Sequence, residues 1–272
     1  MTDDLLALAV TAARAAGALL RERFHAARTS IETKSSATDM VTDADRAAEA
    51  LITEGIRSER PDDALLREET GEVPGTSGFR WVVDPLDGTT NFLFGIPHWA
   101  VSIGCEDAEG GVAGVVYDPL RDELFSAIRG AGAFLNGAPL APSGATDLGR
   151  ALIGTGFSYL PEERAAAAAL LPRILPRVRD VRRMGAAALD IVWVAAGRLD
   201  GFYESGLAPW DRAAGALIAQ EAGARIDMMP ALGPNGGGLI VATPEIFEQL
   251  RDLIDRALGE SARESRPARL AR

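Results

Sequence analysis

Apolar residues recur at helical spacing near the start of the chain and predict two amphipathic helices. Over residues 4–24, leucines and alanines return every three or four positions, which places them on one face of a helix. Over residues 43–58, a second stripe of alanine, leucine and isoleucine follows the same spacing. Thr42 precedes this second helix and is suited to cap its first turn.

After the second helix the pattern changes to short apolar runs separated by turn residues. These runs predict strands at 63–67, 79–83, 100–105, 112–117 and 123–127. Asp118-Pro119 and Asn136-Gly137 mark two of the turns between strands and indicate a mainly antiparallel sheet. Residues 1–145 are therefore expected to form an N-terminal α+β half made of two helices and this sheet.

From residue 146 the chain alternates between strand and helix patterns, which predicts a C-terminal α/β half over residues 146–258. The expected strands are 152–154, 200–204 and 238–242, and the expected helices are 161–175, 186–197, 210–222 and 244–258. Residues 259–272, which are mainly Arg, Ser, Pro and Ala, predict a disordered tail. The two halves are expected to form one integrated catalytic unit.

Composition restricts the kind of partner that the chain can bind. Its 272 residues are at the upper end for a single domain, and 47% hydrophobic and 25% charged residues are typical of a soluble globular protein. A net charge of −11 argues against nucleic acid or an anionic membrane as partner, because both need a basic surface. An anionic phosphate substrate remains compatible with this charge where bound cations reverse the local sign.

The sequence shows no pattern typical of a disulfide, a signal peptide or a membrane-spanning helix. Cys105 is the single cysteine, so no intrachain disulfide can form. The acidic N-terminus lacks the basic and apolar regions of a signal peptide, and no apolar run approaches about 18 residues. We therefore expect a cytoplasmic protein.

The segment Trp81–Phe92 carries the most specific chemistry in the sequence. A predicted buried strand leads into Asp84 and Asp87, and Pro85 holds Asp84 extended. The following turn can bring the two carboxylates to one side, where they repel each other unless a cation lies between them. Backbone N–H groups of Gly88-Thr89-Thr90 can form an anion-binding concavity. A cation site beside an anion site is what metal-assisted phosphate chemistry requires.

The remaining ligand types favour a hard cation. The chain has two histidines and one cysteine without zinc-like spacing, so a zinc site is not expected. Carboxylates and a backbone carbonyl are the available donors, and these suit Mg²⁺.

Three segments resemble the motifs of the inositol monophosphatase family. Asp84–Phe92 is similar to D-P-[IL]-D-G-T-T-N-F, and Pro209–Ala214, closing on Glu221–Gly223, is similar to the second family motif. The stretch Lys34-Ser35-Ser36 through Asp39, Val41, Thr42 and Asp45 resembles the early K-S-S-x-x-D-x-V-T-x-x-D segment. The resemblance covers about residues 5–258. It implies an α+β fold, a layered α-β-α-β-α sandwich of the inositol monophosphatase and fructose-1,6-bisphosphatase type, with the site where the halves meet.

The resemblance also implies the ligands of two or three Mg²⁺ ions. Asp84 would bridge two of them, Asp87 and Asp211 would complete the second site, and the Leu86 carbonyl and Glu68 would serve the first.

A water molecule held by Glu68 and Thr89 is the nucleophile that the family implies, with Asp45 orienting the Thr89 hydroxyl from behind. Glu68 is followed by Glu69, and Arg67 stands where the family usually has a small residue. Glu69 is therefore the alternative for this position.

Further residues are assigned to the substrate on the same resemblance. Backbone N–H groups of Gly88, Thr89 and Thr90 would hold the phosphate. The groups expected to contact the alcohol are Glu204, Gly185, Ala186 and Ala187. Ala186 replaces the usual hydroxyl residue of the family, so only a backbone contact is expected there.

These assignments imply a Mg²⁺-dependent phosphomonoesterase that acts on a small-molecule phosphate ester, myo-inositol 1-phosphate or a similar polyol phosphate. The family also implies lithium sensitivity and a homodimer. Histidinol phosphate, fructose 1,6-bisphosphate and 3′-phosphoadenosine nucleotides are alternative substrates, although nucleotide-specific relatives tend to carry D-G-T-K-E-F in place of the segment 87–92. A non-catalytic cation-binding protein is the alternative of another class, and the presence of both Glu68 and Thr89 argues against it.

Overall fold

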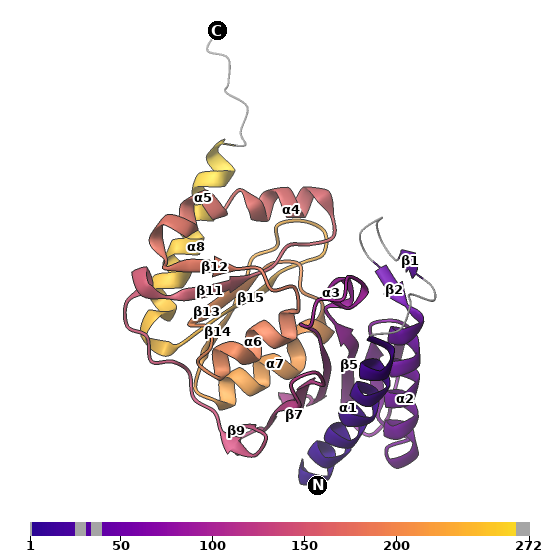
Figure 1. The fold of residues 1–272 in the computed structure, drawn as a ribbon. Helices are drawn as coiled ribbons and strands as arrows, with labels where there is room; N and C mark the ends of the chain where they lie inside the picture. The colour runs from indigo at the N-terminus through magenta and orange to yellow at the C-terminus, as the bar shows by residue number, and fades with distance from the viewer. Residues whose placement is uncertain (1, 25–30, 34–39, 265–272) are drawn as a thin grey trace.

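The computed structural model describes residues 2–24, 31–33 and 40–264, and these residues form alternating layers of helices and sheets (Figure 1). An outer pair of helices, α1 (Thr2–Phe24) and α2 (Asp43–Glu59), covers one face of the first sheet. Between the two sheets lie α6 (Ala187–Ala195) and α7 (Pro209–Glu221). The far face of the second sheet is covered by α8 (Pro244–Glu264). The predicted α-β-α-β-α layering is confirmed.

The first sheet has eight strands in the order β10-β9-β8-β7-β6-β5-β3-β4. Only the pair β3 and β5 is parallel, so the sheet is mainly antiparallel as predicted. Its strands are β3 (Ala64–Arg67), β4 (Gly71–Val73), β5 (Arg80–Asp87), β6 (Ala100–Asp107), β7 (Gly110–Asp118), β8 (Glu123–Ile128), β9 (Gly132–Leu135) and β10 (Ala138–Pro139). The predicted turn at Asn136-Gly137 joins β9 to β10, and both residues have positive φ angles, 50° and 82°.

The second sheet is mixed, with five strands in the order β12-β11-β13-β15-β14. Strand β11 is parallel to both neighbours, and the other pairs are antiparallel. The strands are β11 (Leu152–Thr155), β12 (Asp180–Arg182), β13 (Gly201–Glu204), β14 (Arg225–Met229) and β15 (Gly238–Ala242). The sequence pattern did not predict β12 and β14, because both are edge strands whose residues are mostly partly or fully exposed. A separate short hairpin pairs β1 (Ile31–Thr33) with β2 (Met40–Thr42).

Two predicted helices differ from the structure. The expected helix 161–175 is interrupted. Its first part, α4 (Pro161–Ala168), ends before Pro172, and α5 (Leu171–Ile174) and a short 3₁₀ turn (Leu175–Arg177) each begin with a proline in their first turn. The last helix extends to Glu264, so residues 259–264 are helical rather than part of a tail. Residues 265–272 of the predicted tail and Lys34–Asp39 of the early motif lie outside the described residues. None of the described helices is both long and apolar enough to cross a membrane.

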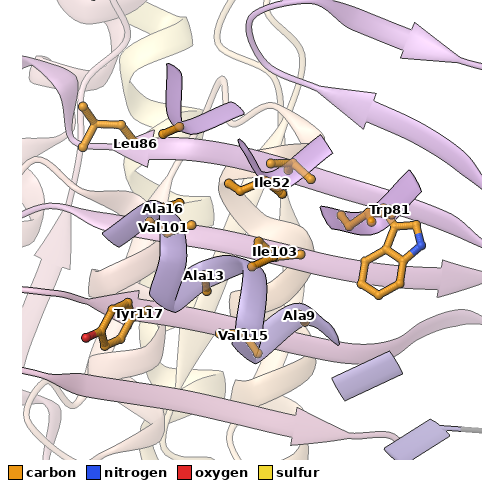
Figure 2. Close-up of a cluster of buried hydrophobic side chains, with 14 of the residues drawn as sticks. Ala9, Ala13, Ala16, Ile52, Trp81, Leu86, Val101, Ile103, Val115 and Tyr117 are labelled. Carbon is orange, nitrogen blue, oxygen red and sulfur yellow. The ribbon is translucent and has the colours of Figure 1, made fainter. Parts of the chain in front are cut away.

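Three hydrophobic cores hold these layers together. In the first, Ala9, Ala13 and Ala16 of α1 face strands β6 and β7, where Ile103 and Val115 are buried (Figure 2). The second core fills the space between the two sheets around α6 and α7, and the third lies between the second sheet and α8. Burial of apolar area in all three cores is the main favourable contribution to folding.

Glycines in the first sheet leave room for α7 to pack against it. A Cβ added at Gly114 would meet the backbone of Ala214 at 3.1 and 3.2 Å, and one at Gly104 would meet Ala213 Cβ at 3.2 Å. Backbone atoms in the middle of a helix cannot move aside as a flexible side chain can. The two glycines therefore fix the distance between α7 and the sheet, and with it the position of Asp211 in the first turn of α7.

We expect the substitution Gly114→Val to lower the free energy of unfolding by about 2 kcal/mol, because overpacking forces α7 away from the sheet. The phosphatase activity that the resemblance implies should also fall, since α7 carries Asp211. Thermal unfolding and turnover of the folded protein measure the two effects. Gly55→Ala on α2 is the matched control, because no atom lies within 4 Å of the added Cβ. It should stabilise the helix by up to about 1 kcal/mol. Equal melting temperatures for Gly114→Val and the wild type would contradict this account.

Candidate active site

Strand β5 ends with two buried carboxylates, Asp84 and Asp87, where the two halves of the chain meet. Asp84 pairs with Ser102 and Asp87 with Ala100, so the register of β5 against β6 shifts between the two acids. Such a bulge re-aims side chains at the end of a strand. The Leu86 N–H donates to Asp84 Oδ1 at 3.0 Å, which closes the turn. Both carboxylates are less than one-tenth exposed.

The short helix α3 (Thr89–Leu93) begins directly after this bulge. Its N-cap, Gly88, has a φ of 92°, a conformation that glycine adopts at little cost. A Cβ at Gly88 would also meet the His98 carbonyl at 3.1 Å and Ala186 Cβ at 3.2 Å. Conformation and space thus both require glycine in the turn that was predicted to hold phosphate.

Thr89 and Asp45 lie in hydrogen-bonding contact although 44 residues separate them. Thr89 Oγ1 is 3.0 Å from Asp45 Oδ1 and 3.1 Å from the Leu86 carbonyl oxygen. Asp45 is fully buried in the first turn of α2. This contact is the one that the predicted role of Asp45 requires.

Three further carboxylates act on Asp84: Asp87 from the same strand, Glu68 from the loop after β3, and Asp211 from α7. Burial raises the pKa of Asp84 well above its usual value, and the negative charges of Glu68, Asp87 and Asp211 raise it further. The Glu68 side chain also hydrogen-bonds Asp84. Glu68 also lines the cavity beside the cluster, and the backbone N–H of its neighbour Glu69 donates to Glu49 Oε2 at 2.8 Å. Glu68 thus lies within the carboxylate cluster.

Asp87 also caps the N-terminus of α6 from the other half of the chain. The N–H groups of Ala187 and Ala188 donate to its carboxylate at 3.0 and 2.8 Å. Burial and the charge of Asp190 raise the pKa of Asp87 to about 8, whereas the helix N–H groups act in the opposite direction. Asp211 has a similar role on α7, where its Oδ2 accepts the Ala208 N–H at 2.7 Å. Asp87 thus joins the start of α6 to the end of β5, whereas Asp211 caps the first turn of its own helix.

The carboxylate oxygens of the cluster fit a hard divalent cation, although these side chains accept hydrogen bonds from backbone N–H groups in the structure. Among the described residues, no group of three His, Cys, Asp or Glu side chains is arranged to hold a metal ion as it stands. Asp84, Asp87 and Asp211 each accept a backbone N–H, yet a carboxylate oxygen has further lone pairs available for a ligand. Their mutual repulsion favours a cation between them, and oxygen donors suit Mg²⁺.

A cavity of about 390 Å³ opens beside this cluster. Eight of the predicted site residues line it: Glu68, Asp87, Gly88, Gly185, Ala186, Ala187, Glu204 and Asp211. The others do not line the cavity: Asp84, Leu86, Thr89 and Asp45 are buried, and Thr90 contacts Tyr159, which does line it. The structure therefore brings the predicted site residues from both halves together.

Glu204 at the end of β13 forms the acidic wall of the cavity. Burial raises the pKa of Glu204 to about 8, Arg183 lowers it, and the negative charges of Asp211 and Asp190 raise it. A Cβ at Gly156 would lie only 1.9 Å from Glu204 Oε2, so the carboxylate occupies the space that this glycine leaves. The position of Glu204 thus depends on a residue in the neighbouring loop.

Several cavity residues were not assigned a role from the sequence. Arg183, Tyr159 and Asn235 line the cavity, and the Tyr159 hydroxyl bonds to Thr90 while burial raises its pKa to about 12. Asn91 lies within the motif itself, and its Nδ2 donates to the carbonyls of His98 and Met184 at 2.8 and 2.9 Å. The position of Asn91 within the motif could have indicated its role from the sequence. Loop residues such as Tyr159 lie outside any motif and give no such indication.

Comparisons with known proteins agree with this arrangement. The sequence profile of the Inositol monophosphatase family matches residues 1–258. The chain is 41% identical to Nus factor SuhB of Escherichia coli (strain K12), over 93% of this chain and 98% of that protein. It is 45% identical to an inositol-1-monophosphatase of Mycobacterium bovis, over 84% and 82% of the two chains. The solved structure of the extragenic suppressor protein suhB from Bartonella henselae superposes with a TM-score of 0.87 at 39% identity, covering 93% of this chain and 99% of that one.

The family match and the fold define a phosphomonoesterase with metal-dependent chemistry. The chain belongs to the inositol monophosphatase family. The activity that goes with this membership is hydrolysis of a phosphate monoester.

Proposed function

We propose that this chain hydrolyses myo-inositol 1-phosphate or a similar polyol phosphate with the help of Mg²⁺. The observation that carries the proposal is the meeting of a buried carboxylate cluster around Asp84 with the acidic wall formed by Glu204 in one cavity. The first feature suits cations that bind phosphate. The second suits hydroxyl groups, because a carboxylate accepts strong hydrogen bonds from them.

We assign Asp84, Asp87, Asp211, Glu68 and the Leu86 carbonyl to the cations. Bound Mg²⁺ supplies positive charge for the phosphate and lowers the pKa of a water molecule. Asp87 and Asp211 keep their backbone donors in this arrangement, and these donors hold both carboxylates in place.

The protein groups that handle the attacking water are Glu68 and Thr89. The Thr89 hydroxyl donates its hydrogen toward Asp45. The Thr89 oxygen can therefore accept a hydrogen bond from a water molecule. Glu68 provides a second acceptor, so the water is oriented by two fixed groups. Backbone N–H groups of Gly88, Thr89 and Thr90 are assigned to the phosphate oxygens at the start of α3.

The alcohol part of the substrate is assigned to Glu204 and the loop Gly185-Ala186-Ala187. Histidinol phosphate, fructose 1,6-bisphosphate and phosphoadenosine nucleotides remain the alternative substrates. Lithium sensitivity, a homodimer and a cytoplasmic location belong to the same proposal on family resemblance; a lithium titration and a solution mass check the first two. Relatives at 41% identity carry the name Nus factor SuhB, so net charge alone is not sufficient to exclude nucleic acid from the partners of this chain.

Asp84→Asn should lower kcat by about a thousandfold or more, because the shared cation ligand is lost and metal activation contributes several kcal/mol. The fold should persist, since the change removes a negative charge from a repulsive cluster. Turnover with myo-inositol 1-phosphate and thermal melting in EDTA are the measurements. Asp62→Asn, an exposed acid outside the cavity, is the control. Activity within tenfold of the wild type would refute the role of Asp84.

Glu204→Gln should lower kcat/KM for myo-inositol 1-phosphate by about tenfold, because an uncharged acceptor forms weaker hydrogen bonds. Hydrolysis of p-nitrophenyl phosphate, which has no ring hydroxyls, should change much less. An equal loss with both substrates would show that Glu204 supports the cluster or the fold instead.

Gly156→Ala provides an independent perturbation for the same prediction, because it displaces the Glu204 carboxylate without neutralising it. It should show the same selective loss. If both variants keep full activity on inositol phosphate, the acidic wall does not contact the substrate.

A further inference from the structure

Helix α2 carries two buried acids one turn apart, and only one of them has a role so far. Asp45 and Glu49 are 0% and 1% exposed, and residues four positions apart lie on the same face of a helix. Asp45 contacts Thr89, as described above. Glu49 accepts the Glu69 N–H on Oε2 at 2.8 Å and the Thr70 hydroxyl on Oε1 at 2.5 Å.

These contacts fall on the loop that carries Glu68. Strands β3 and β4 pair from Arg67 opposite Gly71, so residues 68–70 are the three-residue loop of a hairpin. Gly71 has a φ of 77°, which is typical of the residue that closes such a loop. Hairpin loops are the more mobile parts of a sheet. A catalytic acid in such a loop therefore needs support from outside the hairpin.

Glu49 supplies that support from a rigid element. The Glu68 N–H donates to the Val83 carbonyl at 3.1 Å on one side of the residue. On the other side, Glu49 binds the next two residues of the chain. Burying a carboxylate is costly unless hydrogen bonds compensate it, and here both oxygens of Glu49 are used on the loop. An alanine or leucine would fill this core position at lower cost if packing were the only requirement.

We propose that Glu49 is a positioning residue for Glu68, and that α2 aligns both groups of the water-holding pair as one unit. Asp45 orients the Thr89 hydroxyl, and Glu49, one turn further along the same helix, holds the loop that positions Glu68. This inference rests on the proposed roles of Glu68 and Thr89. The inference predicts that loss of the Glu49 contacts lowers kcat even in variants that remain folded.

The test compares substitutions at Glu49 and at its partner Thr70. Glu49→Ala should lower kcat by about a hundredfold with little change in KM, because displacement of a catalytic group by about 1 Å has effects of this size. Glu49→Gln retains one acceptor oxygen and should give an intermediate kcat. Thr70→Val removes one of the two hydrogen bonds without changing the volume of the side chain. Thr70→Val should therefore lower kcat by a smaller factor than Glu49→Ala. It tests the same contact if Glu49→Ala does not fold.

Glu54→Ala, on the exposed face of the same helix, is the matched control and should leave kcat unchanged. The melting temperature of each variant in EDTA separates positioning from stability. If the folded Glu49 and Thr70 variants melt at lower temperature but keep wild-type kcat, the inference is overturned. An equal loss in Glu54→Ala would also overturn it. A wild-type protein that hydrolyses no phosphate monoester would overturn the proposed function together with the inference, whereas an active wild type confines the failure to Glu49.

Discussion

Asp84 lies buried at the end of β5 among other negative charges, and the organisation of the site follows from this repulsion. Burial and the charges of Glu68, Asp87 and Asp211 all raise the pKa of Asp84. A cluster of like charges in a buried position destabilises the protein that contains it unless a cation or hydrogen-bond donors offset the repulsion. The fold supplies the donors, and the proposed Mg²⁺ ions supply the positive charge.

The donors lie at the starts of two helices that line the same cavity. Asp87 accepts N–H groups at the start of α6, and Asp211 caps the start of α7. Both helices lie between the two sheets and pack against the first one, with α7 held close by Gly104 and Gly114. Asp87 of the first half is thus stabilised by backbone N–H groups of the second half, and this contact joins the two halves at the cluster.

The sequence contained enough information to predict much of this arrangement. The buried strand β5, the amphipathic helix α2 and the local order of Asp84, Asp87 and Gly88 follow from periodicity and turn chemistry over short stretches. The prolines at 172 and 176 signalled the interruption of the helix predicted at 161–175, although the apolar spacing continues across them. The edge strands β12 and β14 did not follow, because half-exposed edges weaken the periodic pattern. Cavity residues such as Arg183 and Tyr159 were also missed, since their function depends on contacts across the fold. The same reason explains Glu49, whose partners Glu69 and Thr70 lie about twenty positions away.

The most direct test of the account is the melting temperature of the protein in EDTA and in millimolar Mg²⁺. Binding to the folded state alone adds about 2.7 kcal/mol of stability at a hundredfold excess over Kd. For a chain of this size, that corresponds to a rise of roughly 5–10 °C. The account predicts this rise for the wild type and a much smaller one for Asp84→Asn, in which the shared carboxylate is lost. No rise for the wild type, or an equal rise for both proteins, would contradict a cation site built on the charge repulsion around Asp84.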